Sequence, residues 1–375
     1  MKKILVVFGT RPEAIKLAPV IKELQATGAA ETRVCVTGQH RQMLDQVLKL
    51  FGITPDFDLN LMRPGQDLTD VTAGVLQGMR LVLSEFRPDW VVVQGDTTTT
   101  FAATLAAFYQ KSRVAHVEAG LRTGCLLAPW PEELNRRLTT VMANLHFPPT
   151  ARAAACLLRE GVSAEVICET GNTVIDALLM VVERIRSDDS LAVALRERFD
   201  FLSPDCRLLL VTGHRRESFG QPLEAICRAL RRLGERPDVQ IVYPVHPNPN
   251  VQQLVKQYLS GLPRVHLIDP QDYLPFVYLM MRAYLIITDS GGVQEEAPSL
   301  GKPVLVMRDT TERPEAVEAG TVRLVGAHEH RIVDEATRLL EDQREYQRMS
   351  SVHNPYGDGQ ASSRIVRRML QEVSP

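Results

Sequence analysis

The sequence has no long apolar run, no cysteine motif and no excess of charge of one sign. No hydrophobic stretch approaches the ~18 apolar residues of a membrane-spanning helix, and the N-terminal run MKKILVVFG is too short for a secretory signal. The six cysteines include no CxxC pair and no cysteine–histidine cluster with zinc spacing. The formal net charge of -2 provides no global field for nucleic acid or an anionic membrane. We therefore expect a cytoplasmic protein that binds neither.

Short apolar runs alternate with amphipathic helical stretches along almost the whole chain. Runs rich in Val, Ile and Leu without alternation are typical of strands buried on both faces, and so of a parallel sheet covered by helices. The runs are KILVVFG (3–9), TRVCVT (32–37), DWVVVQGD (89–96), RVAHVEAG (113–120), RLLLVTGH (207–214), VQIVYPVH (239–246), RVHLI (264–268), YLIIT (284–288) and KPVLVM (302–307).

The spacing of these runs predicts two domains. A helical, charge-rich stretch without a strand signal follows residue 170 and separates the two sets of strands, and 375 residues suffice for two cores. We expect an α/β protein of two doubly wound Rossmann-like domains that face each other across a cleft, with residues 1–170 in the first and 171–360 in the second. Residues 361–375 form an amphipathic helix.

The polar residues that follow the predicted strands fall into two chemical groups. Ligands of open α/β sheets bind at the carboxyl ends of strands, so these positions are the candidates for a site. Carboxylates dominate the first half, with Asp96, Glu118 and Glu132. Groups that bind phosphate dominate the second half, namely His214, Arg215, Gly291, Gly292 and Arg313. A diphosphate bound by one domain and a polyol bound by the other indicate a nucleotide sugar as the ligand.

The stretch ITDSGGVQEE (287–296) combines a strand, a glycine turn and a helix start, which together favour phosphate binding. Ser290 and the two glycines offer backbone N–H groups to a diphosphate. Glu296 lies about one turn inside the helix, where its carboxylate can accept bonds from two ribose hydroxyls. We expect Glu295 to face another way and to act only as a partner of the helix dipole.

Each acidic candidate also has a structural interpretation. Asp96 can cap the helix that the following threonines begin, Glu118 can be an ion-pair partner, and Glu132 can be a first-turn acid. His214 and His246 can be buried structural histidines. The coincidence of all these groups at strand ends and helix starts favours a site.

Long motifs in a fixed order make the chain resemble the bacterial non-hydrolysing UDP-N-acetylglucosamine 2-epimerases. The resemblance runs from residue 3 to about 366. The motifs are GTRPEAIK (9–16), QGDTTTT (94–100), HVEAGLRT (116–123), PWPEE (129–133), TGNTVIDAL (170–178), TGHRRESFG (212–220), DPQDYLPF (269–276), TDSGGVQEEAPSLGKPVLVMRDTTERPEA (288–316) and NPYGDGQAS (354–362).

The resemblance implies a glycosyltransferase-B-like fold, a C-terminal helix that crosses back to the first domain, and a homodimer. It also implies an enzyme that makes UDP-N-acetylmannosamine for surface polysaccharide. Asp96, Glu118 and Glu132 match the family's essential acidic residues, and His214 matches the residue that supports departure of the diphosphate. The matches to the UDP-binding set are Arg11, Lys16, Gln271, Phe276, Ser290, Gly291, Gly292, Glu296 and Arg313. The matches to a second site, where the substrate also acts as activator, are Gln39, His40, Gln42, Arg215 and His246.

The chemistry of C2 inversion leaves two routes. Transient oxidation needs a nicotinamide, and the nearest glycine fingerprint, Gly357-Asp358-Gly359, follows no predicted strand. The other route removes the C2 proton as the anomeric C–O bond to UDP breaks, giving 2-acetamidoglucal and UDP, which recombine. That route needs an acid–base pair and a firm hold on the leaving UDP. We expect no cofactor and no obligatory metal, and the sequence does not identify which carboxylate takes the proton.

Other functions use parts of the same pattern. A glycosyltransferase shares the fold and the donor site but needs an acceptor groove. A hydrolysing epimerase releases UDP and free N-acetylmannosamine. A nucleotide-sugar sensor needs only the second-half groups, and the three acids of the first half speak against it.

Overall fold

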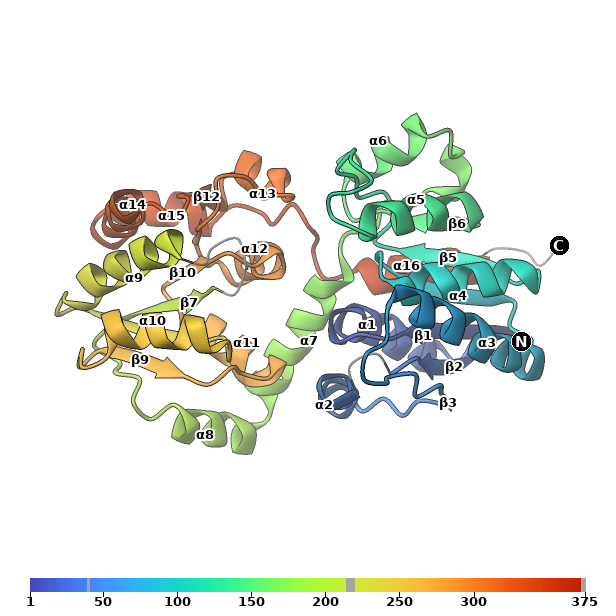
Figure 1. Cartoon of the computed structure of the whole chain (residues 1–375), viewed down its shortest axis with the longest axis horizontal. Helices are drawn as coiled ribbons and strands as arrows, with labels where there is room; N and C mark the ends of the chain where they lie inside the picture. Colours follow the sequence, from blue (N-terminus) through green and yellow to red (C-terminus); the bar gives the residue numbers. More distant parts are fainter. Residues whose placement is uncertain (39–40, 214–219, 372–375) are drawn as a thin grey trace. The chain divides into compact units, whose positions relative to one another are not determined.

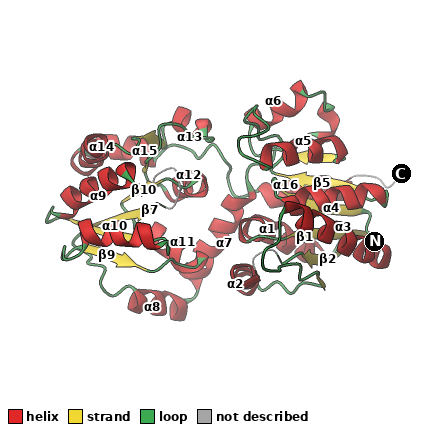
Figure 2. Cartoon of the chain, in the orientation of Figure 1, coloured by secondary structure: helices red, strands yellow, loops and turns green. Residues whose placement is uncertain are grey.

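The structure is a computed structural model that describes residues 1–38, 41–213 and 220–371. The chain divides into two compact units (Figure 1). The first comprises Met1–Ala177 together with Gly357–Pro375, and the second comprises Leu178–Tyr356. Each unit has its own sheet and its own covering helices (Figure 2). No helix of the described ranges is long and apolar enough to cross a membrane.

The first unit contains a six-stranded parallel sheet in the order β3-β2-β1-β4-β5-β6. The direction of strand order reverses between β1 and β4, and this is the switch point where doubly wound folds bind ligands. The strands are β1 (Lys2–Phe8), β2 (Ala30–Val36), β3 (Phe57–Asp58), β4 (Trp90–Gln94), β5 (Arg113–Val117) and β6 (Leu145–Phe147).

Two groups of helices cover this sheet. Helix α1 packs on α2 and α16, whereas α4 packs on α3 and α5. Because parallel strands are joined by right-handed crossovers, these two groups lie on opposite faces of the sheet. The helices are α1 (Arg11–Thr27), α2 (Arg41–Phe51), α3 (Leu68–Phe86), α4 (Thr98–Tyr109), α5 (Glu132–Met142), α6 (Ala151–Arg159) and the C-terminal α16 (Ala361–Gln371). A short 3-10 turn spans Ala164–Val166.

The second unit repeats the same winding. Its sheet has the order β12-β11-β10-β7-β8-β9 and is parallel throughout, with the switch point between β7 and β10. The strands are β7 (Arg207–Thr212), β8 (Val239–Pro244), β9 (Val265–Ile268), β10 (Leu285–Thr288), β11 (Val304–Val306) and β12 (Val322–Leu324). The predicted class, two doubly wound Rossmann-like domains, is confirmed.

The helices of the second unit follow its strands in turn. Helix α9 packs on α10 and α14 over one face of the sheet. The helices are α8 (Asp189–Arg198), α9 (Gln221–Gly234), α10 (Pro249–Leu259), α11 (Tyr273–Arg282), α12 (Gly291–Glu296), α13 (Pro314–Ala319), α14 (Glu329–Glu341) and α15 (Gln343–Ser350). Helix α7 (Thr173–Ser187) carries the chain from the first unit into the second, and a 3-10 turn spans Ala297–Leu300.

Burial explains why the apolar runs became strands. All five residues of β4 are buried, as are the last five of β1, so both faces of these strands are covered. Every predicted run contains a strand. The strands β3, β6 and β12 were not predicted, because each has only two or three residues and shows no periodicity.

Helix α16 belongs to the first unit although it ends the chain. It packs on α1, and its first backbone N–H groups are capped by Asp176 of α7, with the Ser362 N–H at 2.8 Å and the Ala361 N–H at 3.3 Å from the carboxylate oxygens. At its other end, the Lys2 Nζ donates to the carbonyls of Met369 and Leu370. Residues far apart in sequence therefore close the first unit.

Candidate active site

The turn after β1 begins the site of the first unit. Thr10 is the N-cap of α1, and its backbone N–H and hydroxyl both donate to Glu13 in a capping box. Arg11 is the first residue of the helix and pairs with no other described residue. Lys16 lies one turn further along, where its ammonium reaches Glu118 at 2.5 Å.

Glu118 follows β5 in a left-handed backbone conformation with φ of 62°. Its side chain is almost fully buried, and its Oε2 accepts bonds from Lys16 Nζ and Gln94 Nε2, each at 2.5 Å. A non-glycine residue rarely adopts a positive φ without a local constraint, and such positions gather at functional sites. The predicted candidate is therefore an ion-pair partner, and its environment keeps the carboxylate next to a cation.

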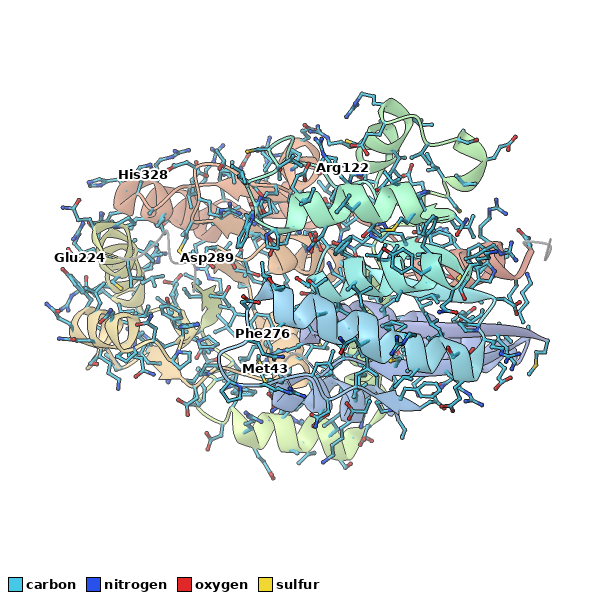
Figure 3. The ribbon with its side chains drawn as sticks, turned by 45° about the vertical axis from the view of Figure 1, so that its right-hand side comes forward. Met43, Arg122, Glu224, Phe276, Asp289 and His328 are labelled. Atoms are coloured by element: carbon cyan, nitrogen blue, oxygen red, sulfur yellow. The ribbon has the colours of Figure 1, made fainter. Side chains whose placement is uncertain are left out.

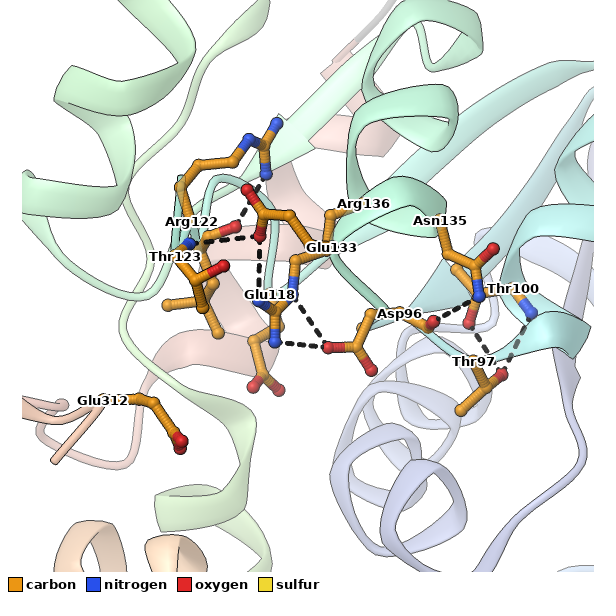
Figure 4. A network of polar contacts seen from close by, with 12 residues as sticks. Asp96, Thr97, Thr100, Glu118, Arg122, Thr123, Glu133, Asn135, Arg136 and Glu312 are labelled. Carbon is orange, nitrogen blue, oxygen red and sulfur yellow. Dashed lines mark hydrogen bonds and ion pairs between the residues drawn. The ribbon is translucent and has the colours of Figure 1, made fainter. Parts of the chain in front are cut away.

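Asp96 follows β4, the neighbour of β1 at the switch point. The Arg136 guanidinium donates to Asp96 Oδ2 from Nε at 2.8 Å and from Nη2 at 2.7 Å. The Asn135 side chain binds the Asp96 carbonyl at 2.9 Å (Figure 4). Asp96 is not the helix cap, because Thr97 occupies that position and accepts from the Thr100 N–H at 3.1 Å.

Glu133, the second acid of PWPEE, organises the loop that follows Glu118. It is fully buried and accepts bonds from the backbone N–H groups of Thr123 at 3.1 Å and Gly124 at 3.2 Å. It also accepts from Arg136 Nη1 at 3.2 Å, so one arginine joins Glu133 to Asp96 (Figure 4). Sequence reasoning missed both Glu133 and Arg136. The only sequence signal for Glu133 was the pair of adjacent glutamates in PWPEE (129–133).

Glu132 begins α5 and differs from the other two acids of the predicted set. Its Oε2 atom is buried, and no described residue forms a hydrogen bond with it. Asp96 and Glu118 each face a cation, whereas the buried Glu132 Oε2 has no hydrogen-bond partner among the described residues.

His116, on β5, contacts the turn that carries Asp96. It is fully buried, and its Nε2 lies 2.7 Å from the Gly95 carbonyl, the residue before Asp96. Burial lowers its pKa from 6.5 to about 4, so the ring is neutral at physiological pH.

The strand–glycine–helix segment of the second unit has the predicted form. Ser290 is the N-cap of α12, and its backbone N–H donates to Thr288 Oγ1 at 2.9 Å. Gly291 and Gly292 are the first two helical residues. The Arg313 guanidinium lies beside Gly291, because a methyl group built at this glycine would be 3.5 Å from the guanidinium carbon.

The two acids of α12 have separate partners. Arg313 Nε donates to Glu295 Oε1 at 2.5 Å, and Glu295 is buried. The expectation that Glu295 serves only the helix dipole was wrong, because its partner is the arginine predicted for phosphate binding. Glu296 is also buried and accepts from the Tyr273 hydroxyl at 2.5 Å. Tyr273 lies in the quoted motif DPQDYLPF but was not singled out.

The remaining predicted residues are more dispersed. Gln271 accepts from Arg198 Nη2 at 2.8 Å and donates to the Asp269 carbonyl at 2.6 Å, just before α11. Phe276 is half-buried on α11 (Figure 3). His246 follows β8, and its Nδ1 accepts from the Asn248 N–H at 3.2 Å. Four predicted residues lie outside the described ranges, namely Gln39, His40, His214 and Arg215. Gln42 belongs to α2, but the position of its side chain is not described.

Comparison with known proteins points to one family. The chain matches the family model of UDP-N-acetylglucosamine 2-epimerase over residues 22–370. It is 62% identical to the UDP-N-acetylglucosamine 2-epimerase of Escherichia coli strain K12 over 365 residues, which cover 97% of each chain.

Two solved structures extend the likeness to the fold. The UDP-GlcNAc 2-epimerase of Neisseria meningitidis, solved with UDP-GlcNAc bound, superposes with a TM-score of 0.91 at 51% identity, over 99% of this chain and 100% of that one. The enzyme of Methanocaldococcus jannaschii, solved with UDP-GlcNAc and UDP, superposes with a TM-score of 0.80 at 34% identity, over 98% and 99%. The glycosyltransferase-B-like fold class is thereby confirmed, and the chain belongs to the UDP-N-acetylglucosamine 2-epimerase family.

Proposed function

We propose that this protein is an isomerase that interconverts UDP-N-acetylglucosamine and UDP-N-acetylmannosamine by inverting C2. Family membership supports this activity, and one structural observation supports it further. The carboxylates Asp96, Glu118 and Glu132 all follow strands or begin a helix in the first unit, yet each has different ionic surroundings. Groups of one chemical type in distinct environments are what acid–base chemistry with charge stabilisation requires.

The reaction proceeds by elimination and re-addition of UDP. Removal of the C2 proton and cleavage of the anomeric C–O bond give 2-acetamidoglucal and UDP, and re-addition with protonation from the other face gives the epimer. The glycine pair Gly357 and Gly359 lies between α15 and α16 and follows no strand, so it is not a dinucleotide-binding loop. The route needs no hydride acceptor.

We assign proton transfer at C2 to Glu132, because its Oε2 has no hydrogen-bond partner among the described residues. Asp96 and Glu118 instead each form an ion pair, with Arg136 and Lys16 respectively. In this assignment the two carboxylates stabilise the positive charge that develops at C1 as UDP departs.

The second unit supplies the predicted UDP site. The backbone N–H groups at the start of α12, together with Arg313, suit the diphosphate, since helix N-termini and guanidinium groups both bind anions. Glu296 is the ribose acceptor in this proposal, and Tyr273 orients its carboxylate. The resemblance of the motifs assigns Gln271 and Phe276 to uracil contacts, and Arg11, Lys16 and His214 to binding of UDP.

Further features of the proposal extend beyond the reaction. The protein acts as a cytoplasmic homodimer that supplies a precursor of surface polysaccharide. UDP-N-acetylglucosamine also binds as an activator at a second site that includes Gln39, His40, Gln42, Arg215 and His246. The homodimer, the role in polysaccharide supply and the activator site rest on the resemblance of the motifs.

Proton NMR of UDP-N-acetylglucosamine with the purified protein in D2O tests the proposal. We expect the sugar H2 signal to be lost while UDP-N-acetylmannosamine appears, without any added cofactor. UDP with free N-acetylmannosamine as the main product would instead indicate the hydrolysing reaction. Retention of the H2 signal at high substrate would contradict the epimerase assignment and favour a glycosyltransferase.

A further inference from the structure

A buried carboxylate connects the two turns at the switch point of the first unit. Glu13, on α1, is almost fully buried. Its Oε2 accepts from the Gly9 N–H at 3.0 Å, and from the Thr10 N–H and hydroxyl, each at 2.8 Å. Its Oε1 accepts from the Thr97 hydroxyl at 2.6 Å. One side chain therefore binds the β1 turn with one oxygen and the start of α4 with the other.

A fifth contact extends this connection to a residue that holds Glu118. The Thr100 hydroxyl lies 3.1 Å from Glu13 Oε1 and 2.7 Å from the Gln94 carbonyl. The Thr100 hydroxyl donates its single proton to the closer acceptor, the Gln94 carbonyl. The side chain of Gln94 in turn donates to Glu118. Lys16, one turn beyond Glu13 on the same helix, donates to Glu118 as well.

The surroundings of Glu13 are unusual for a buried acid. Its hydrogen-bond partners among the described residues are backbone N–H groups and hydroxyls, and none is a cation. Burial raises its pKa, while the hydrogen bonds from Thr97, Gly9 and Thr10 act in the opposite direction. An acid without a counter-ion is costly to bury, and here the hydrogen bonds that satisfy the Gly9 and Thr10 N–H groups offset part of that cost. Such a cost is accepted where geometry at a functional site depends on the group.

We propose that Glu13 is a positioning residue for the epimerase reaction, setting the distance between the β1 and β4 turns through the length of its side chain. Asp96 directly precedes Thr97, so the bond from Thr97 to Glu13 holds the residue next to Asp96. Lys16 fixes Glu118 from the same helix. This inference rests on the proposed function, since it concerns the carboxylates that the reaction uses.

Two conservative substitutions of Glu13 separate the effect of its side-chain length from the effect of its charge. Glu13→Gln keeps the length. Its amide oxygen can face the N–H groups of Gly9 and Thr10, while its amide N–H donates to Thr97, whose hydroxyl proton then turns to Thr100, 3.1 Å away. Glu13→Asp keeps the charge but is one methylene shorter, so its carboxylate cannot reach both turns. If length is what matters, the glutamine variant retains activity and the aspartate variant loses it.

The test measures kcat, KM and product partition for UDP-N-acetylglucosamine in both variants. We expect Glu13→Asp to lower kcat about 10²-fold, because a displacement of about 1 Å at reacting groups has effects of this size. We expect Glu13→Gln to stay within about threefold of the wild type. Glu23→Asp, further along α1, is the matched control and should leave kcat unchanged. The aspartate variant should also release more 2-acetamidoglucal and UDP per epimer formed, since misplaced carboxylates impair re-addition.

The outcomes distinguish failure of the inference from failure of the proposed function. If the wild type does not exchange H2 in D2O, the function itself is wrong. If the wild type does exchange H2, two results would refute the positioning role. One is a Glu13→Asp variant with the kcat and product partition of the wild type, and the other is a Glu13→Gln variant that loses more activity than Glu13→Asp. If Glu13→Asp does not fold, Thr97→Val and Thr97→Ser replace it. The valine variant should have a lower kcat and release more 2-acetamidoglucal, whereas the serine variant should keep the kcat and the product partition of the wild type. Equal behaviour of the two variants would refute the role.

Discussion

At the scale of single residues, two pairs of adjacent glutamates show that neighbouring residues of the same type can have different partners. In α5, Glu133 is buried against Arg136 and a loop, whereas the Oε2 of its neighbour Glu132 accepts no bond from a described residue. In α12, Glu295 pairs with Arg313 and Glu296 binds a tyrosine hydroxyl. Neighbours on a helix point about 100° apart, so one acid of each pair faces internal partners that the other cannot reach.

Arg136 provides the first residue-scale prediction. Three different N–H groups of its guanidinium bind Asp96 and Glu133, and the single ammonium of lysine cannot reproduce this fork. We expect Arg136→Lys to lower kcat by about 10-fold to 10²-fold with a small change in KM, because Asp96 loses its orientation. Steady-state kinetics measure both parameters.

Arg137 is the matched control for this substitution. It lies next to Arg136 on α5, is more exposed, and approaches Glu133 only at 3.6 Å. Arg137→Lys should leave kcat within about twofold of the wild type, since its pair with Glu133 at 3.6 Å lies beyond hydrogen-bond distance. An equal loss in both variants would mean that α5 as a whole, and not the fork on Asp96, was disturbed.

Glu132 provides a second residue-scale prediction. If its Oε2, which accepts no hydrogen bond from a described residue, transfers the C2 proton, Glu132→Gln should abolish H2 exchange in D2O while UDP still binds. Proton NMR follows the exchange, and calorimetric titration with UDP checks binding. Normal exchange in the variant would transfer the role to Asp96 or Glu118.

At the scale of elements, the closure of the first unit depends on the N-terminus of α16. Asp176, on α7, accepts the N–H groups of Ala361 and Ser362 and the Ser362 hydroxyl. These are orphan donors of a helix start, and a carboxylate there also favours the helix dipole. The sequence motif TGNTVIDAL contains this aspartate, but only the fold shows that its partner lies more than 180 residues away.

We expect Asp176→Ala to destabilise the first unit by about 1–3 kcal/mol, because two backbone N–H groups lose their acceptor. Urea unfolding followed by tryptophan fluorescence measures this selectively, since both tryptophans, Trp90 and Trp130, belong to the first unit. Glu85→Ala, at an exposed position of α3, is the control and should be neutral. An unchanged urea midpoint for Asp176→Ala would show that packing on α1 alone holds α16.

At the scale of the whole molecule, two neutral histidines are part of the core of the first unit. His116 and His146 are paired residues of β5 and β6, and both are buried. The pKa of each is lowered from 6.5 to about 4, mainly by burial and, for His146, also by the neighbouring His116. His116 and His146 therefore bind protons more weakly in the folded first unit than in the unfolded chain.

This difference predicts a loss of stability in acid. Between pH 6.5 and about 4 the unfolded chain binds more protons at these positions than the folded one, so the free energy of unfolding falls as the pH falls. Each histidine contributes a slope of at most about 1.4 kcal/mol per pH unit. Urea unfolding by tryptophan fluorescence at several pH values measures the slope.

His146→Gln should reduce this slope, whereas His330→Gln, at an exposed position of α14 in the second unit, should leave it unchanged. Overall destabilisation of the His146 variant does not affect the test, because the slope and not the absolute stability is compared. A slope identical to that of the wild type in His146→Gln would show that other groups cause the acid sensitivity.

The sequence by itself determined the fold class, because continuous Val, Ile and Leu runs between helices permit little but a buried parallel sheet. It also determined the family, since motifs of fixed order extend over most of the chain, and it identified Asp96, Glu118 and Glu132 as candidates. The tertiary structure decided which partner each acid has. Glu13 meets Thr97 across 84 residues only when β1 and β4 pair, and Lys16 meets Glu118 across 102. Such partners depend on strand order and helix rotation, and local sequence patterns carry no record of contacts at that separation.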